Sequence, residues 1–322
     1  MPLVRFVVLL AALILPAGLH AQEPYPNRPV RMIVPFPPGG PADLIARVMA
    51  QKLSEDLGKQ FYIENHSGAG GNIGVGVAAR APADGYSIMI NSQATVTNKS
   101  LYKSLPYDPF KDLIAVTRIA TTPNVVVVHP SVPAKTMQEL VELMRTGGDK
   151  YNGYAHPGLG TPSNLYGEFF RMKQNLKLTS IPFGGGGPMI QSVVAGHTPV
   201  AFSSLPPATP HVQAGRLRAL AVTADKRDER LPDVPTMAEA GYPGQTGETP
   251  IGIFVPAGTP AAIVDLLHRK VVALVATADV KAKLAAIGFT PVADTPAEFA
   301  AFLRAEDEKW GKVIRDAGIK IE

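Results

Sequence analysis

The stretch PVRMIVPFPPGGPADLIARVMAQKLSEDLG, residues 29–58, contains the structural unit from which the fold is inferred. It opens with an apolar run over residues 29–34 that has the composition of a buried strand. Glycines and prolines follow. A helix is predicted over residues 42–57, because apolar residues recur there at helical spacing and Gly58 is placed to end it. The unit is therefore a strand, a junction rich in glycine and proline, and a helix.

The same kind of junction occurs three more times in the chain. It reads PFPPGGPAD at residues 35–43, SGAGGNIG at 67–74, HPGLGTPS at 156–163 and PFGGGGPM at 182–189. In three of them Pro41, Pro162 or Pro188 stands where the first helical residue is expected. Each junction leaves unpaired N–H groups at the positive end of a helix, which favours an anion. One junction is an ordinary α/β turn, but four of them favour a ligand held between two lobes.

The rest of the chain alternates short β-rich runs with helical ones, which predicts an α/β architecture with largely parallel sheets. Strands are predicted at residues 29–34, 60–64, 86–90, 124–128, 151–155, 178–182, 200–204, 217–223 and 251–255. Helices are predicted at residues 42–57, 72–80, 136–145, 162–174, 189–195, 260–276, 279–287 and 296–317.

Composition excludes several classes of protein. The chain has 322 residues, 46% of them hydrophobic, which is enough to build a full core. It has no cysteine, so thiolate metal sites, iron–sulfur clusters, cysteine nucleophiles and disulfides are excluded. The net charge of +4 is not gathered into a basic stripe, so we expect no nucleic-acid partner.

The N-terminus has the layout of a secretory signal peptide over residues 1–21. One cation, Arg5, precedes an apolar run at residues 6–15, and small residues lead to a cleavage site after Ala21. The apolar run is too short to span a bilayer. We therefore expect a soluble protein exported to the periplasm.

Motifs for catalysis or cofactors are weak. The glycines at residues 68–74 miss the dinucleotide spacing, because Ile73 occupies the third glycine position. The histidines have no i, i+4 partner that would hold a metal, and only His156 is expected near a ligand. A secreted hydrolase with Ser92 or Ser203 as nucleophile and His156 as base is an alternative, but it lacks a nucleophile elbow and an orienting acid. We predict no enzyme, no cofactor and no metal.

Six ordered motifs resemble one known family. They are PFPPGGPADLIAR (35–47), ENHSGAGGNIG (64–74), APADGY (81–86), GTPS (160–163), LPDVPTMAEAGY (231–242) and VPAGTP (255–260). They are similar to motifs of the extracytoplasmic solute receptors of tripartite tricarboxylate transporters, the Bug family. The resemblance implies a type II periplasmic binding-protein fold with two α/β lobes around a central cleft. Residues 22–122 and 225–322 would form lobe 1, and residues 123–224 lobe 2.

The resemblance also implies a set of ligand-binding positions. In lobe 1 they are Phe36, Gly39, Gly40, Asp43, Gly71, Asn72 and Ser92. In lobe 2 they are His156, Gly158, Thr161, Pro162, Ser163, Phe183, Gly187 and Ser203. The family usually has Tyr and then Lys or Arg where Phe183 and Gly184 stand. The missing hydroxyl and cation make that wall less polar, and the glycine run is expected to make the pocket roomier.

The resemblance implies a monomeric receptor that traps a small organic carboxylate and delivers it to a two-component membrane permease. A receptor that feeds a sensor kinase is an alternative that the sequence leaves open. The apolar wall favours ligands with one well-bound carboxylate and an apolar, aromatic or water-bridged far end over citrate-like triacids.

Overall fold

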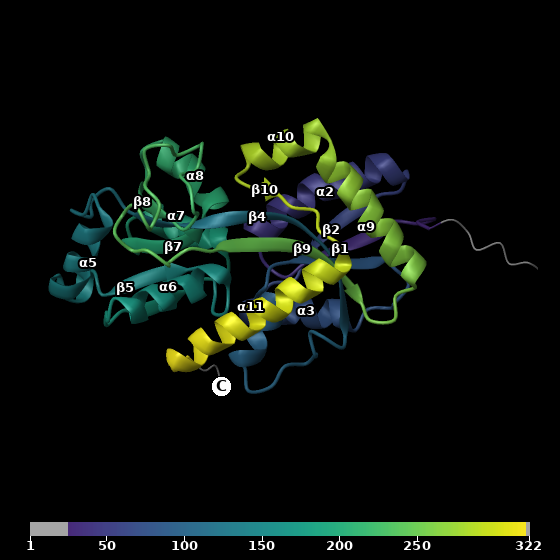
Figure 1. Cartoon of the computed structure of the whole chain (residues 1–322), viewed down its shortest axis with the longest axis horizontal. Coiled ribbons are helices and arrows are strands. Elements are labelled where there is room, and N and C mark those ends of the chain that lie inside the picture. The colour runs from purple at the N-terminus through teal and green to yellow at the C-terminus, as the bar shows by residue number, and fades with distance from the viewer. Residues whose placement is uncertain (1–24, 320–322) are drawn as a thin grey trace, which may run out of the picture.

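The structure, a computed structural model, describes residues 25–319, so the predicted signal peptide lies outside the described residues. Strands form a continuous path in the order β2-β1-β3-β9-β4-β7-β5-β6, and β8 and β10 also pair with β4. Helices cover both faces of this path, and two groups of helices and strands lie end to end (Figure 1). The α/β class and the two lobes are as predicted.

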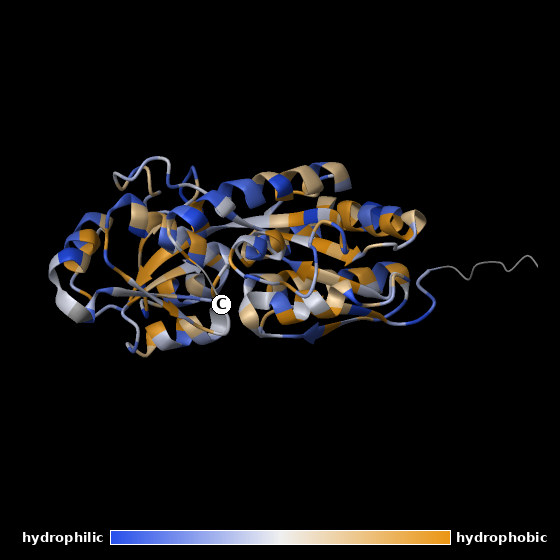
Figure 2. Ribbon diagram, turned by 90° about the horizontal axis from the view of Figure 1, so that it is seen from below, coloured by the Kyte–Doolittle hydropathy of each residue, from blue (hydrophilic) through white to orange (hydrophobic). Residues whose placement is uncertain are grey.

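The first lobe is built on a short parallel sheet. β1 (Val30–Val34) lies between β2 (Phe61–Asn65) and β3 (Ser87–Asn91), parallel to both. One face is covered by α2 (Pro41–Leu57), α9 (Ala261–Ala276) and α10 (Ala278–Ala286), and the other by α3 (Asn72–Ala79) and α11 (Pro296–Asp316). Apolar residues of the sheet and of these helices pack together between the layers, and Figure 2 marks the hydrophobic stretches of the ribbon in orange.

The second lobe repeats this layering. β5 (Gly153–His156) pairs in parallel with β6 (Thr179–Pro182) and with β7 (Val200–Ser204), and β8 (Arg218–Val222) pairs with β4. α5 (Met137–Thr146) and α6 (Pro162–Lys173) pack on one face. α7 (Gly186–Val194) and α8 (Leu205–Gln213) pack on the other.

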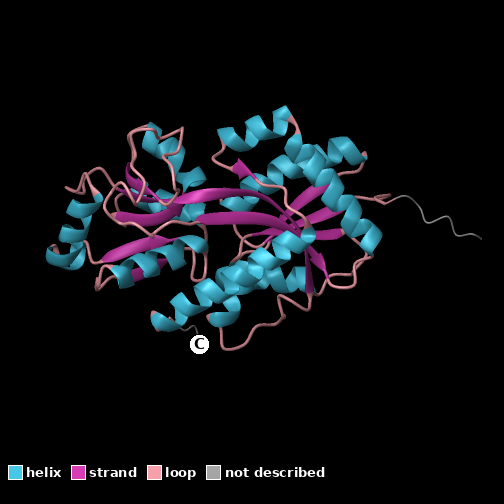
Figure 3. Ribbon diagram, viewed as in Figure 1, coloured by secondary structure: helices cyan, strands magenta, loops and turns pink. Residues whose placement is uncertain are grey.

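Two long strands join the lobes (Figure 3). β4 (Leu113–Val128) pairs antiparallel with β9 (Glu248–Pro256) as far as Pro123, and from Asn124 onward it pairs antiparallel with β7. The prediction of largely parallel sheets is therefore correct within each lobe and wrong for the crossing strands. The first two thirds of β4 were not predicted, because Thr117, Arg118 and the threonines at 121–122 interrupt its apolar run.

Two helices differ from the predicted ones. α8 was not predicted at all, because Pro206, Pro207 and Pro210 argue against a helix, yet the first two lie in the opening turn, where no intrahelical N–H bond is lost. α7 begins at Gly186, three residues earlier than predicted, so Pro188 is its third residue and not its first. The short helix α4 (Ala94–Thr97) follows β3, and the two-residue strand β10 (Thr290–Pro291) pairs with β4.

The C-terminal helix α11 packs against both lobes. Phe299 and Leu303 belong to the core of the first lobe, whereas Trp310 and Ile314 belong to the core of the second. The assignment of residues 22–122 and 225–322 to one lobe and 123–224 to the other stays a prediction. Met237 and Ala240 pack in the core of the second lobe. This packing favours moving the boundary predicted after residue 224 to a later position, nearer the start of β9. Within residues 25–319 no helix combines the length and apolarity that crossing a membrane requires.

Trp310→Ala is expected to lower the free energy of unfolding by about 3–5 kcal/mol, because a large buried side chain in contact with Tyr166 and Phe169 is lost. Chemical denaturation measures the change. Lys312→Ala, two residues away with an exposed side chain, is the matched control and should change stability by less than about 1 kcal/mol. Equal effects of the two variants would contradict a role of Trp310 in joining α11 to the second lobe.

Candidate functional site

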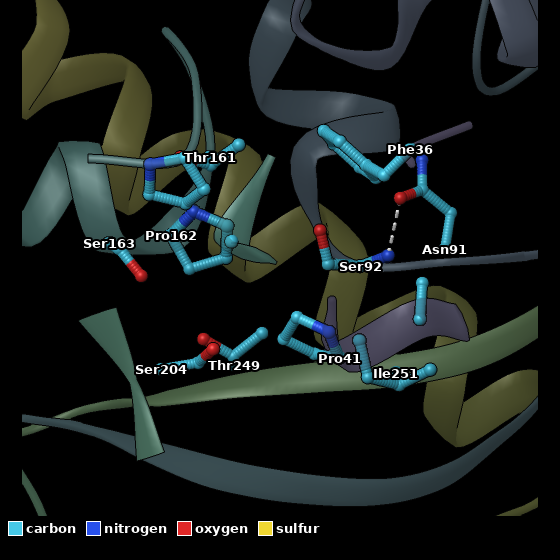
Figure 4. Close-up of a pocket in the computed structure, with 13 residues that line it drawn as sticks. Phe36, Pro41, Asn91, Ser92, Thr161, Pro162, Ser163, Ser204, Thr249 and Ile251 are labelled. Carbon is cyan, nitrogen blue, oxygen red and sulfur yellow. Dashed lines mark hydrogen bonds between the residues drawn. The ribbon is translucent and has the colours of Figure 1, made fainter. Parts of the chain in front are cut away.

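A narrow cavity of about 40 Å³ lies between the two lobes, against the crossing strand β9. Figure 4 shows its wall, to which both lobes contribute. The first lobe provides Phe36, Pro41, Ala42, Asn91 and Ser92. The second lobe provides Pro157, Thr161, Pro162, Ser163, Gly186 and Ser204, and β9 provides Thr249 and Ile251.

Four helices begin at this cavity. Pro41 and Ala42 open α2, Pro162 and Ser163 open α6, Gly186 opens α7, and Ser204 is the N-cap of α8. The first N–H groups of a helix have no intrahelical acceptor, and the helix dipole places partial positive charge there. Among the described residues that line the cavity, none is charged. Attraction for an anion therefore comes from backbone N–H groups and hydroxyls.

Three of the four predicted junctions reach the cavity and one does not. The junctions at residues 35–43, 156–163 and 182–189 each contribute lining residues. The junction at 67–74 lies beside the cleft, where a Cβ on Gly70 would come within 2.5 Å of the Leu159 carbonyl oxygen. This glycine lets the backbones of the two lobes approach, and it does not contact the cavity.

Five predicted site residues line the cavity: Phe36, Ser92, Thr161, Pro162 and Ser163. Ten others lie outside its lining: Gly39, Gly40, Asp43, Gly71, Asn72, His156, Gly158, Phe183, Gly187 and Ser203. Four of these ten lie in loops, and the others lie at the ends of helices and strands. Asn72, for example, accepts hydrogen bonds from Asn98 and Tyr107, and Phe183 packs against the core of the second lobe.

Asp43 fixes the loop before α2. Its carboxylate accepts hydrogen bonds from the Gly39 N–H at 3.0 Å, from the Arg47 guanidinium at 2.9 and 3.1 Å, and from the Asn65 amide at 3.1 Å. The side chain is buried. With its oxygens occupied in this way, Asp43 positions the junction and does not face a ligand.

His156 has a similar supporting role in the second lobe. Its Nδ1 accepts the Gly158 N–H at 3.3 Å, so its Nε2 carries the proton toward Ser180 Oγ at 2.7 Å. Burial lowers the pKa of His156 from its ordinary 6.5 to about 4, so the ring is neutral at neutral pH. The side chain holds the loop that leads to Thr161. His156 does not line the cavity, so it is not positioned to act there as a general base.

The glycine run after β6 brings the lobes together. A Cβ on Gly185 would lie 2.8 Å from Pro37 Cδ, and one on Gly187 would lie 3.2 Å from the Pro38 carbonyl oxygen. These backbones face Pro37 and Pro38 across the cleft. The expectation of a roomier pocket stays a prediction; in this structure the glycines allow the two lobes to approach closely.

Several lining residues were not predicted. Ser204 lines the cavity in place of Ser203, whose hydroxyl turns to the Ser204 carbonyl oxygen at 2.8 Å. Pro206 and Pro207 by themselves fit the first turn of a helix, and this interpretation, which Pro210 discouraged, would have identified Ser204 as the N-cap. Thr249 and Ile251 are brought in by β9, and only the topology of the sheet shows that.

Two lobes that close on helix N-termini, with a small cavity at the crossing strands, define the class of bilobed solute-binding proteins. Residues 45–319 match the model of the tripartite tricarboxylate transporter family receptor. The chain belongs to this family, as the sequence motifs implied.

Similar proteins agree with this assignment. BugT of Bordetella pertussis is 33% identical over 327 residues, with full coverage of both chains. The structure of Rpa4515 of R. palustris with adipate has a TM-score of 0.89 and 34% identity, and covers 92% of this chain and 100% of that one. MatC of Rhodopseudomonas palustris with bound malate has a TM-score of 0.84 and 29% identity, and covers 90% and 100%. The family and these neighbours are binding receptors and not enzymes, and the family's receptors are periplasmic.

Gly185→Ala is expected to weaken carboxylate binding about tenfold, because the new methyl group meets the rigid Pro37 ring and holds the lobes apart. Gly184→Ala is the matched control, since a Cβ there has nothing within 4 Å. Calorimetric titration with a small carboxylate that the wild type binds measures affinity, and a melting curve checks that both variants fold. If both variants bind as the wild type does, the contact has no part in closure.

His156→Gln is expected to flatten the dependence of stability on pH. Unfolded His156 takes up a proton near pH 6.5 and the folded ring only near pH 4, so stability falls as the pH drops between these values. Between pH 7 and pH 5 this group costs the wild type about 2 kcal/mol. Urea unfolding at both pH values measures it. An unchanged difference in the variant would show that another group causes the loss.

Proposed function

We propose that this protein is an exported receptor that closes its two lobes on a small organic carboxylate and delivers it to the two-component membrane permease of a tripartite tricarboxylate-type transporter. The observation that carries the proposal is the meeting of four helix N-termini, from both lobes, at one narrow cavity. The adipate and malate found in the similar structures support a carboxylate as ligand.

The proposed contacts follow the cavity wall. The carboxylate accepts hydrogen bonds from N–H groups in the first turns of α6 and α7 and from hydroxyls such as Ser92 and Ser204. Phe36, Pro162 and Ile251 contact the carbon skeleton. The ten predicted positions outside the lining then serve the site indirectly, as Asp43 and His156 do.

The composition of the wall narrows the class of ligand. Burying a second or third carboxylate without a cation costs several kcal/mol. The cavity offers fixed dipoles, a few hydroxyls and apolar walls. We propose ligands with one well-bound carboxylate and an apolar, aromatic or water-bridged far end, ahead of citrate-like triacids. Cleavage after Ala21, release to the periplasm and a monomeric state belong to the same proposal.

A thermal-shift screen of residues 22–322 tests the function. Benzoate, phenylacetate, succinate, adipate, malate and citrate are compared, and a ligand that binds only the folded state raises the melting temperature. We expect shifts with one or more mono- or dicarboxylates and little with citrate. A shift with citrate alone would contradict the proposed ligand class, and no shift with any would contradict the carboxylate receptor.

A pair of serine variants tests the place of binding. Ser92→Ala removes a hydroxyl of the cavity wall and should weaken the best ligand of the screen about three- to tenfold. Ser67→Ala is the control, because Ser67 is exposed on the junction that does not reach the cavity. If the two variants bind alike, the ligand lies elsewhere.

A further inference from the structure

Asn124 lies where β4 leaves one lobe for the other. It is the first residue of β4 that pairs with β7, and its partner in that register is Ser204 of the cavity wall. Its backbone N–H donates to Thr223 Oγ1 at 2.8 Å. The side chain is fully buried. Asn124 was not predicted as a site residue and does not itself line the cavity.

The Asn124 carboxamide sets the direction in which two hydroxyls of the cavity wall donate their protons. Its Oδ1 accepts a hydrogen bond from Ser163 Oγ at 2.7 Å and a weaker one from Thr249 Oγ1 at 3.5 Å. Each hydroxyl has one proton and two lone pairs. With its proton committed to Asn124, the Ser163 hydroxyl presents only lone pairs to a ligand, and the longer contact favours the same orientation of the Thr249 hydroxyl. Figure 4 shows these two hydroxyls and that of Ser204 at one end of the cavity.

The same carboxamide carries a donor that is left over. Asn124 Nδ2 has no hydrogen-bond partner among residues 25–319, although it is buried. An unpaired buried donor is costly, and such groups in native proteins commonly await a water or a ligand. Beside the cavity, the Asn124 Nδ2 donor without a partner therefore lies next to the Ser163 and Thr249 hydroxyls, which are oriented to accept.

Different ligand groups fit this arrangement to different degrees. A carboxylate oxygen would accept from Nδ2 but would face the lone pairs of Ser163 and Thr249. An ammonium group would donate to both hydroxyls but would leave Nδ2 unpaired. A hydroxyl group does both, since its oxygen accepts and its proton donates.

We propose that the ligand is a hydroxycarboxylate whose hydroxyl is recognised by Asn124, Ser163 and Thr249, with Asn124 as the specificity-determining residue. The inference rests on the proposed carboxylate receptor. The carboxylate lies on the exposed N–H groups of the helix starts, and the hydroxyl lies at the end of the cavity nearest the crossing strands.

Calorimetric titration with matched ligand pairs tests this on residues 22–322. Malate and succinate differ by one hydroxyl, and so do mandelate and phenylacetate, which carry an aromatic body. In at least one pair we expect the hydroxylated acid to bind about tenfold more tightly or better, because a site built for a hydroxyl rejects the analogue that lacks it. Equal affinities within every pair that binds would overturn the inference and leave the carboxylate receptor intact. Binding of none of the four would overturn the inference, and the thermal-shift screen, which also contains benzoate and adipate, would still decide the carboxylate receptor.

Two variants separate recognition from a structural role. Asn124→Leu releases the protons of Ser163 and Thr249, and the ratio of affinities within the pair should fall to about twofold or less. Thr249→Val keeps the shape and β-propensity of the strand while removing one acceptor, and should lower the ratio too. Thr209→Val, which removes a buried hydroxyl bonded within α8, is the control and should keep the ratio. A ratio that survives in both Asn124→Leu and Thr249→Val would overturn the inference, since a structural role lowers both affinities alike.

Discussion

The unpaired N–H groups at the start of a helix need an acceptor, and the architecture of this protein concentrates that need at one place. α2, α6, α7 and α8 come from different parts of the chain and begin at the same cavity. The carboxyl ends of the short parallel strands lie at the cleft. The junctions that follow them are rich in glycine and proline, so few large side chains cover the helix N-termini there. Positive potential is thereby supplied without a lysine or arginine, whose long side chain would lose conformational freedom on binding.

The two lobes approach each other through backbone that carries few side chains, and two irregularly paired strands connect them. Gly185 and Gly187 meet Pro37 and Pro38 across the cleft, so a rigid proline surface faces a strip with almost no side chain. Behind the cavity, β4 and β9 run without a break between the lobes, and register shifts in their pairing mark places where the strands bend. The cavity thus lies between the contact of the glycine run with Pro37 and Pro38 and the paired strands β4 and β9.

Much of this fold is readable from local patterns, and the misses have physical reasons. Strands such as β1 and β7 are short apolar runs, and α2 combines helical spacing with Pro41 at its start and Gly58 at its end. The first part of β4 was missed because Thr117, Arg118 and the threonines at 121–122 interrupt its apolar run. The site was harder. Ser204 rather than Ser203 faces the cavity because side chains alternate along a strand, and Thr249 arrives from a segment far away in sequence. His156 looked like a ligand residue, yet its ring is buried under its own loop.

The cavity wall, as the structure describes it, offers a ligand only groups that do not ionise, namely amide N–H groups and hydroxyls, with the Asn124 carboxamide beside them. A helix dipole is the same at pH 5 as at pH 9, and salt screens it least where water is excluded. The affinity of such a receptor for its solute therefore depends little on the pH and the salt concentration around it. The occupancy of its cleft reports the concentration of the solute, and the acidity and ionic strength of the surroundings enter that reading chiefly through the ionisation of the solute itself.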